Sequence, residues 1–370
     1  MLDDRRCGNL GGGISGKHNL FKEIISLDNL LQAWEEFKYG KMRKKDVVGF
    51  YFDLEDNLLD LRASLMDKSY APAPYAFFYV RDPKLRPIHK ATVCDRVLFQ
   101  AVFRVLYPLF DRHFIFDSYS CRFEKGTHAG VRRLCEFAAK VSENYHRPVY
   151  ALKCDVQKFF YNIDHRILLR LLKREITDEN VIWLLEKIVG SFNVGDSKGL
   201  PLGNVTSQLF ANVYLNELDQ FVKHILKGKF YLRYCDDFII LNNDAEYLVE
   251  VVPVIQKFLD ENLKLNLHPR KVEICKLSQG IDFLGYVSFS RHTVLRTKTK
   301  QRMLKKMSYK RSQLIAGEIK KEKFNQVLQS YLGVLGHCDG YNLENVLKNS
   351  FQNQTSSYKD EAGRRGPRES

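Results

Sequence analysis

Two apolar runs that each lead into aspartate constrain the fold of this chain more than any other feature of its sequence. The first run extends from Val149 to Cys154 and is followed by Asp155. The second surrounds the sequence Tyr-Cys-Asp-Asp, in which Asp236 and Asp237 have apolar residues on both sides. Short apolar runs bounded by polar residues are typical of buried strands. We therefore predict one strand that ends at Asp155 and a hairpin whose tight turn contains Cys235, Asp236 and Asp237.

The three carboxylates would repel one another if these strands lay side by side, because like charges at short range disfavour ionisation. A divalent cation removes this cost, and Mg²⁺ prefers carboxylates together with substrate phosphates. Two such ions, roughly 3.5–4 Å apart, can activate an attacking oxygen and stabilise a leaving group. The pattern therefore favours nucleotidyl transfer, although paired aspartates also occur in ordinary turns. Asp164 precedes an apolar helical stretch, so we expect it to cap that helix rather than to bind metal.

The charge of the chain indicates a polyanionic partner. The 370 residues include 58 Lys and Arg against 44 Asp and Glu, which leaves a net charge of +14. Such an excess favours nucleic acid or an anionic membrane. No segment approaches the ~20 apolar residues of a spanning helix, so we expect nucleic acid and no membrane. Eight scattered cysteines without a C-x-x-C pair argue against a zinc site or a disulfide framework and indicate a cytoplasmic protein.

Helical and strand-like segments follow one another without a regular β-α-β pattern, which predicts an α+β fold rather than a doubly wound sheet. Residues 1–20 are polar and Gly-rich and are expected to be a flexible leader, and residues 351–370 a disordered tail. Between Arg296 and Lys323 there are 11 Lys or Arg against 2 Glu, with apolar residues at helical spacing. We predict one helix there that packs on one side and follows phosphates on the other, with a solvated basic helix as the alternative.

Three ordered motifs resemble those of the reverse transcriptase family. Tyr-Cys-Asp-Asp is similar to the Y-x-D-D motif of the family, and the segment from Asp155 to Phe160 is similar to its first catalytic Asp motif. The segment from Gly199 to Gln208 resembles the motif between them. The flanking matches, which extend the resemblance over roughly residues 50 to 345, are Leu85–Ile88, Asp95–Val97, Phe116–Arg122, Leu267–Lys271, Phe283–Tyr286 and Ser330–His337. The resemblance implies a right-hand polymerase, with fingers and palm over residues 21–290, catalytic palm motifs over 149–290, and a basic helical thumb over 291–350.

Within this family the chain looks most similar to the reverse transcriptases of diversity-generating retroelements. Most relatives carry Q-G-x-x-x-S-P in the middle motif, whereas this chain has an aliphatic residue at Leu202 and a terminal Gln208. We expect no maturase or endonuclease module beyond the thumb, and the motifs of retron enzymes are not evident. The segment from Ile88 to Ala91 departs from the I-x-I-P run of the family, which puts the template contacts of that loop in doubt.

The resemblance also implies a set of metal and nucleotide ligands. Two Mg²⁺ ions, with Mn²⁺ as a substitute, would be bound by three carboxylates and one backbone carbonyl, those of Asp155, Asp236, Asp237 and Val156. Phe160 lies at the steric-gate position, where a bulky ring excludes a ribose 2′-OH, with a place in the core as its alternative. Arg86 and Arg122 match residues that contact the triphosphate of the incoming nucleotide, and surface arginines are the alternative. Gly203 would allow close approach to the nascent base pair, or would simply begin a helix.

Template and primer contacts are implied for a further set of residues, namely Gln208, Tyr234, Lys271, Arg296, Lys298, Lys300, Arg302, Lys305 and Lys306. Structural alternatives remain open at two of them. Gln208 could cap a turn, and Lys271 could be a solvated charge.

We therefore expect an RNA-directed DNA polymerase that copies the template RNA of a retroelement into cDNA. The resemblance implies synthesis that is error-prone at template adenines, as in mutagenic retrohoming, and Leu202 could loosen the geometry there. It also implies dNTPs, an RNA/cDNA duplex and a small basic accessory protein as partners. The alternatives are a retron-type or phage-defence reverse transcriptase and a nucleic-acid-binding scaffold with a vestigial polymerase fold.

Overall fold

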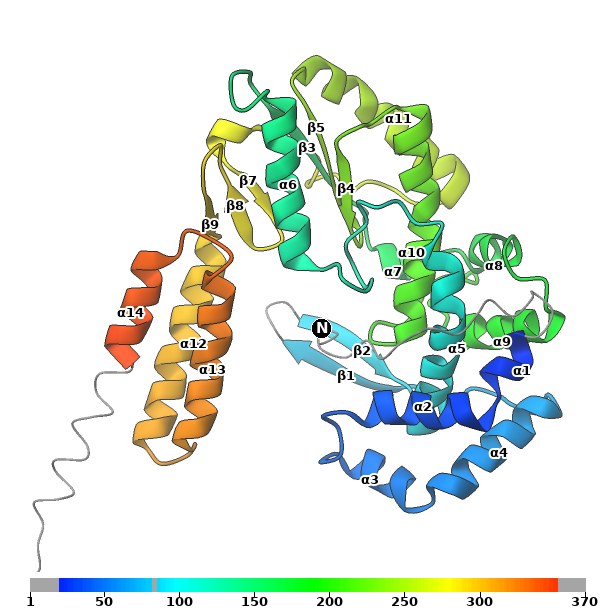
Figure 1. Cartoon of the computed structure of the whole chain (residues 1–370). Helices are drawn as coiled ribbons and strands as arrows, with labels where there is room; N and C mark the ends of the chain where they lie inside the picture. The colour runs from blue at the N-terminus through cyan, green and yellow to red at the C-terminus, as the bar shows by residue number, and fades with distance from the viewer. Residues whose placement is uncertain (1–19, 82–84, 352–370) are drawn as a thin grey trace, which may run out of the picture. The chain divides into compact units, whose positions relative to one another are not determined.

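The computed structural model describes residues 20–81 and 85–351 of the chain (Figure 1). The predicted leader and tail therefore lie almost entirely outside the described residues. Helices and short sheets occur together in the described part, which confirms the expected α+β class. Two compact units are present: the first comprises residues up to 126, 152–240 and 245–273, and the second comprises 127–151, 241–244 and the residues from 274 onward. Each unit is described by itself.

The first unit is built around the long buried helix α5 (Val93–Asp111), against which the N-terminal helices pack. Twelve of its 19 residues are buried, and the side chain of Thr92 caps its first turn. The helices before it are α1 (Leu20–Ile24), α2 (Leu27–Lys38), α3 (Lys45–Phe52) and α4 (Leu54–Met66). After α4, the strands β1 (Ala76–Arg81) and β2 (Leu85–Lys90) form an antiparallel hairpin, which exposes aromatic side chains.

A four-stranded sheet confirms both strand predictions around the aspartates. Its strands are β3 (Tyr150–Asp155), β4 (Tyr231–Tyr234), β5 (Asp237–Asn242) and β6 (Glu273–Lys276), in the order β4-β5-β3-β6. The first strand ends at Asp155, and β4 and β5 form the expected antiparallel hairpin. Apolar side chains of the two hairpin strands are almost fully buried, which explains why these strands are rich in apolar residues.

Further helices of the first unit connect the strands of this sheet. They are α7 (Phe159–Asn162), α8 (His165–Lys173), α9 (Glu179–Gly190), α10 (Val205–Gln220) with a π-helical turn η1 (Phe221–Ile225), and α11 (Ala245–Leu263). The side chain of Asp164 accepts hydrogen bonds from the backbone N–H groups of Arg166 and Ile167. The predicted capping role of Asp164 is therefore confirmed.

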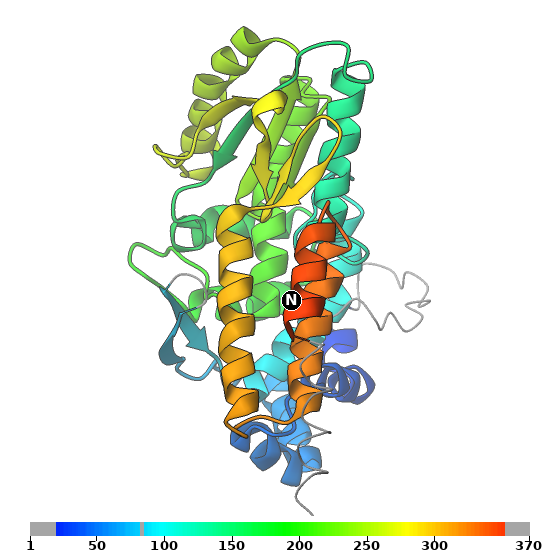
Figure 2. The same cartoon turned by 90° about the vertical axis from the view of Figure 1, so that its left-hand side faces the viewer.

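The second unit contains a small sheet and four helices. Its elements are α6 (Thr127–Val141), the one-turn 3₁₀ helix η2 (Leu277–Gln279), β7 (Ile281–Phe283), β8 (Tyr286–Ser288), β9 (Thr293–Leu295), α12 (Thr297–Ile315), α13 (Lys321–Leu335) and α14 (Tyr341–Phe351). Helices α12, α13 and α14 lie side by side (Figure 2). None of the helices within the described ranges is both long and apolar enough to cross a membrane.

The single helix predicted from Arg296 to Lys323 is wrong, because two helices occupy this segment. Helix α12 ends at Ile315, and α13 begins only at Lys321. Gly317 lies between them with a φ of +73°, a conformation that glycine adopts without steric cost and that commonly ends helices. The turn allows α13 to fold back along α12.

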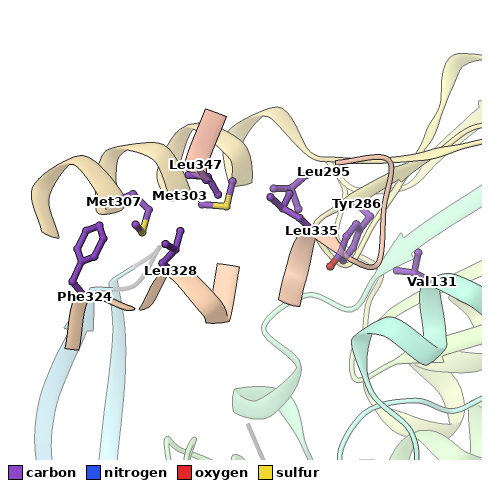
Figure 3. Packing of buried hydrophobic residues seen from close by; sticks show 9 residues of the cluster. All are labelled: Val131, Tyr286, Leu295, Met303, Met307, Phe324, Leu328, Leu335 and Leu347. Atoms are coloured by element: carbon purple, nitrogen blue, oxygen red, sulfur yellow. The ribbon is translucent and has the colours of Figure 1, made fainter. Parts of the chain in front are cut away.

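The amphipathic character predicted for this segment is confirmed. Met303 and Met307 of α12 point toward Phe324 and Leu328 of α13, and Leu347 of α14 completes this part of the cluster (Figure 3). Most of the other side chains of α12 are at least partly exposed, and five of the exposed ones are the cations Lys298, Lys300, Arg302, Lys305 and Lys306. One face of α12 therefore packs in a core while the other presents positive charge to solvent.

Candidate active site

The Tyr-Cys-Asp-Asp sequence forms the tight turn between β4 and β5. Tyr234 pairs with Asp237 across the hairpin, which leaves Cys235 and Asp236 as the two loop residues. Cys235 has a φ of +56°, a conformation that residues with a Cβ rarely adopt. The backbone N–H of Val156 donates to the Asp236 carbonyl at 3.2 Å. This hydrogen bond joins the end of β3 to the turn, as the sequence predicted.

The carboxylates of Asp155, Asp236 and Asp237 come close enough to perturb one another. Burial is the main cause that raises the pKa of Asp236, and repulsion from Asp155 adds to it. The pKa of Asp237 rises to about 7 because of desolvation, a hydrogen bond with Asp155 and the two neighbouring negative charges. Such raised values indicate a cluster of acids that lacks sufficient positive charge.

Lys271 supplies one positive charge to this cluster. Its Nζ donates to Asp155 Oδ2 at 2.5 Å. The segment before it runs along the end of β3, where the N–H of His268 donates to the Asp155 carbonyl at 2.7 Å and the N–H of Gln157 donates to the Asn266 carbonyl at 2.8 Å. Lys271 therefore contacts a carboxylate and is not merely a solvated charge.

The three carboxylates do not form a ready-made metal site. Within residues 20–81 and 85–351, no group of three or more His, Cys, Asp or Glu side chains is arranged so that it could hold a metal ion. Raised pKa values at Asp236 and Asp237 nevertheless indicate that additional positive charge would be stabilising here. This donor set suits Mg²⁺, which takes a few carboxylates and completes its shell with water and substrate phosphates.

Phe160 of α7 is only half-buried, whereas its neighbour Phe159 is 1% exposed. The two rings therefore face different surroundings, and the core role belongs to Phe159. The carbonyl of Phe160 accepts from the N–H of Leu200 at 2.7 Å, which ties α7 to the Gly-Leu-Pro-Leu-Gly loop. The same loop contains Leu202 and Gly203.

Gly203 is exposed and has a φ of +111°. A Cβ at this position would meet only one atom within 4 Å, the Cγ2 of Ile88 on β2, at 3.9 Å. The backbone conformation explains the glycine, and the open space beside it is consistent with close approach of a ligand. Gln208 lies on the first turns of α10 and is partly exposed.

The two predicted triphosphate ligands differ in their surroundings. Arg86 is exposed on β2. The guanidinium of Arg122, in contrast, donates to Asp111 Oδ1 at 2.7 Å and to the carbonyls of Ile115 and Ser118 at 2.6 and 3.2 Å. This geometry favours a structural role for Arg122, because its donors are directed at the protein and its side chain is 8% exposed.

The predicted template and primer contacts lie in both units. Tyr234 is half-buried at the end of β4. Lys298, Lys300, Arg302, Lys305 and Lys306 form the exposed face of α12 described above. Arg296 differs from them because its guanidinium is paired with Asp282 of β7, so that it anchors the start of α12.

Sequence reasoning missed a charged group in the sheet itself. Arg233 of β4 and Asp219 of α10 are both completely buried and form an ion pair. The available signal was an arginine in the middle of an apolar strand. Such a residue requires a buried partner, but the partner's position could not be deduced from the sequence.

Carboxylates at the ends of neighbouring strands beside a tight hairpin are an arrangement that is typical of enzymes which join nucleotides with the help of divalent cations. The family model described as "Reverse transcriptase (RNA-dependent DNA polymerase)" matches residues 81–288, which is 208 of the 370 residues. The chain belongs to the reverse transcriptase family, and its enzyme class is RNA-directed DNA polymerase.

Individual proteins are similar to this chain over part of its length. Protein YkfC of Escherichia coli (strain K12) is 27% identical over 266 residues, which cover 61% of this chain and 69% of YkfC. The group II intron-encoded protein LtrA of Lactococcus lactis subsp. cremoris is 24% identical over 63% of this chain and 49% of LtrA, so this chain spans about half the length of that relative. A solved structure of telomerase from Candida albicans in complex with a fragment of telomeric RNA has a TM-score of 0.48 at 10% identity, and the match covers 74% of this chain and 58% of that one. These relatives do not distinguish the subtype of the reverse transcriptase.

Proposed function

We propose that this chain copies a template RNA into cDNA by adding dNTPs to a primer. The oxygen of the primer 3′-OH attacks the α-phosphorus of the dNTP, and the bond to the pyrophosphate group breaks. The observation that carries this proposal is the convergence of Asp155, Asp236 and Asp237 at the ends of β3 and β5, with raised pKa values at Asp236 and Asp237. Acids arranged in this way need cations to balance their charge, and Mg²⁺ held by a few carboxylates can also bind substrate phosphates.

Divalent cations would be held by the three carboxylates, with the Val156 carbonyl as a further ligand. When bound, such ions supply positive charge to the attacking oxygen and to the leaving pyrophosphate. Family members generally use divalent metals, and we propose two Mg²⁺ ions, for which Mn²⁺ can substitute. Lys271, which contacts Asp155 at 2.5 Å, would keep positive charge at the primer end of the site.

Selection of the nucleotide is assigned to the residues around α7 and the loop before α10. The half-buried ring of Phe160 would collide with a ribose 2′-OH and so favour dNTPs. The exposed guanidinium of Arg86 is suited to phosphate oxygens. Gly203 leaves room beside the nascent base pair, and Leu202 replaces the glutamine that most relatives use there.

We further propose that residues 21–290 act as fingers and palm and residues 291–350 as a thumb. The exposed cations of α12 would bind the template–primer duplex through its phosphates, largely without regard to sequence. Gln208 and Tyr234 would contact template or primer within the palm. A cytoplasmic location, a dedicated template RNA and a small basic accessory protein complete this proposal.

Primer extension on an RNA template with Mg²⁺ tests the polymerase. We expect product with the wild-type chain and with Asp260→Ala, which removes an exposed acid of α11, but not with Asp236→Ala. Equal product after Asp236→Ala, or none with wild type, would refute the proposal. Binding of the duplex without synthesis by the wild type would favour a scaffold with a vestigial fold.

The proposed subtype is a diversity-generating retroelement, supported by Leu202 and Gln208 in the middle motif. Its distinguishing property is misincorporation at template adenines. A pair of near-repeat sequences that differ at adenines, in DNA next to the gene, would support this subtype. Retron-type or phage-defence genes in that position would favour the alternative reverse transcriptases.

A further inference from the structure

A completely buried ion pair lies next to the Tyr-Cys-Asp-Asp turn. Arg233 of β4 and Asp219 of α10 are both 0% exposed. The guanidinium is bidentate, with Nε donating to Asp219 Oδ1 at 2.7 Å and Nη2 donating to Oδ2 at 2.6 Å. The hydroxyl of Tyr231 also donates to Asp219 Oδ1, at 2.6 Å. Burial alone would lower the pKa of Arg233, but the adjacent carboxylate raises it above its usual range, so the pair stays charged.

The remaining nitrogen of the guanidinium, Nη1, contacts the turn between β4 and β5. Nη1 of Arg233 donates to the backbone carbonyl of Cys235 at 3.1 Å and to Asn212 Oδ1 at 3.2 Å. Cys235 is the loop residue with a φ of +56°, directly before Asp236. On the other side of the loop, the N–H of Val156 donates to the carbonyl of Asp236. The two loop carbonyls are therefore held from opposite sides, one by Arg233 and one by β3.

Stability of the fold does not by itself account for this arrangement. Desolvating a buried ion pair is costly, and apolar residues of similar volume often replace such pairs without loss of stability. The backbone of Arg233 also binds the segment from Asp117 to Tyr119, with N–H to carbonyl distances of 2.9 Å in both directions. These bonds survive any change of the side chain. What only the guanidinium provides is a rigid fork that fixes Asp219 and the Cys235 carbonyl at the same time.

We propose that Arg233 is a positioning residue for the active site. Its Nη1 group holds the peptide between Cys235 and Asp236 in the left-handed conformation and thereby aligns the carboxylates of Asp236 and Asp237 for divalent cations. This inference rests on the proposed polymerase function, but its primary test is cation binding, which can be measured without DNA synthesis.

The test compares Arg233→Lys with Tyr231→Phe. Lysine keeps a positive charge opposite Asp219, but its single ammonium group cannot also hold the Cys235 carbonyl. Tyr231→Phe removes a hydrogen bond from the same carboxylate at the same depth, without touching the turn, and so serves as the matched control. Free Mn²⁺ is measured by electron paramagnetic resonance, and folding by circular dichroism. We expect Arg233→Lys to weaken Mn²⁺ binding about tenfold or more, and Tyr231→Phe to change it less than about twofold.

A second variant covers the case in which Arg233→Lys does not fold. Arg233→Met combined with Asp219→Asn removes both buried charges together, so neither is left without a partner. This double variant should fold and show the same loss of Mn²⁺ affinity. Wild-type affinity in a folded Arg233 variant would overturn the inference. An equal loss in Tyr231→Phe would overturn it as well, since the effect would then be general loosening of the core.

Primer extension separates this inference from the proposed function. In an active enzyme, Arg233→Lys should lower kcat with little change in KM for the dNTP, because the substrate-binding residues are untouched. A wild-type chain that binds Mn²⁺ and depends on Arg233 for it, yet makes no DNA, would refute the polymerase and leave the positioning role standing. A wild-type chain that binds no Mn²⁺ would overturn the positioning role.

Discussion

Replacing Asp164 by alanine should destabilise the first unit and leave the carboxylate cluster intact. The Asp164 carboxylate is buried and accepts hydrogen bonds from the N–H groups of Arg166 at 2.9 Å and Ile167 at 3.1 Å. These are the first N–H groups of α8, which have no partner within the helix. The substitution therefore distinguishes an acid that caps a helix from the acids that would bind cations.

The size of the effect follows from the environment of the cap. Losing an Asp N-cap costs typically ~1 kcal/mol, within a range of about 0.5–2 kcal/mol. Ile167 is buried, so water does not readily replace its lost partner, and an unsatisfied buried donor costs about 1–3 kcal/mol. We expect about 2 kcal/mol for Asp164→Ala. Asparagine caps as well as aspartate, so Asp164→Asn should cost less than about 0.5 kcal/mol.

Urea unfolding followed by circular dichroism measures this difference, and a Mn²⁺ titration of the same variants provides the second readout. Both variants should bind Mn²⁺ as the wild type does, whereas Asp155→Asn should not. Equal stability of Asp164→Ala and wild type would show that the cap argument is wrong. Loss of Mn²⁺ affinity in Asp164→Asn would instead place Asp164 in the cation site.

Four further predictions concern the site directly. Because the pKa of Asp237 is raised to about 7, protons should compete with Mn²⁺, and affinity should fall about tenfold per pH unit well below 7; a flat titration would contradict this. In the metal-free protein the folded state retains a proton that the unfolded chain has lost, so the unfolding free energy should decrease as the pH rises from about 4 to about 7. Phe160→Val should raise incorporation of rNTPs relative to dNTPs by about tenfold or more in primer extension, whereas Phe159→Leu, a core change, should leave this ratio unaltered. Leu202→Gln should reduce misincorporation at template adenines, as measured by sequencing the cDNA, and an unchanged error rate would remove Leu202 from the explanation.

Local patterns were sufficient to predict much of this fold. The strand that ends at Asp155, the hairpin around Asp236 and the cap at Asp164 each depend on residues close together in the sequence. The helix break at Gly317 was missed because the charge pattern continues through it. A glycine in a helical pattern can lie within a helix or end it, and only the return of α13 along α12 decides between these outcomes.

The amino-acid sequence by itself indicated the class of the protein, because three ordered motifs, two of which carry aspartates at predicted strand ends, resemble those of one enzyme family. Only the tertiary structure showed what each basic side chain contacts. Lys271 contacts Asp155, Arg122 donates to carbonyls of its own loop, and Arg233 donates from a buried position to the carbonyl of Cys235. The sequence does not show whether the guanidinium of an arginine is exposed to solvent or is hydrogen-bonded to a carbonyl or a carboxylate. Its role follows from the residues that the fold brings around it, which lie far away along the chain.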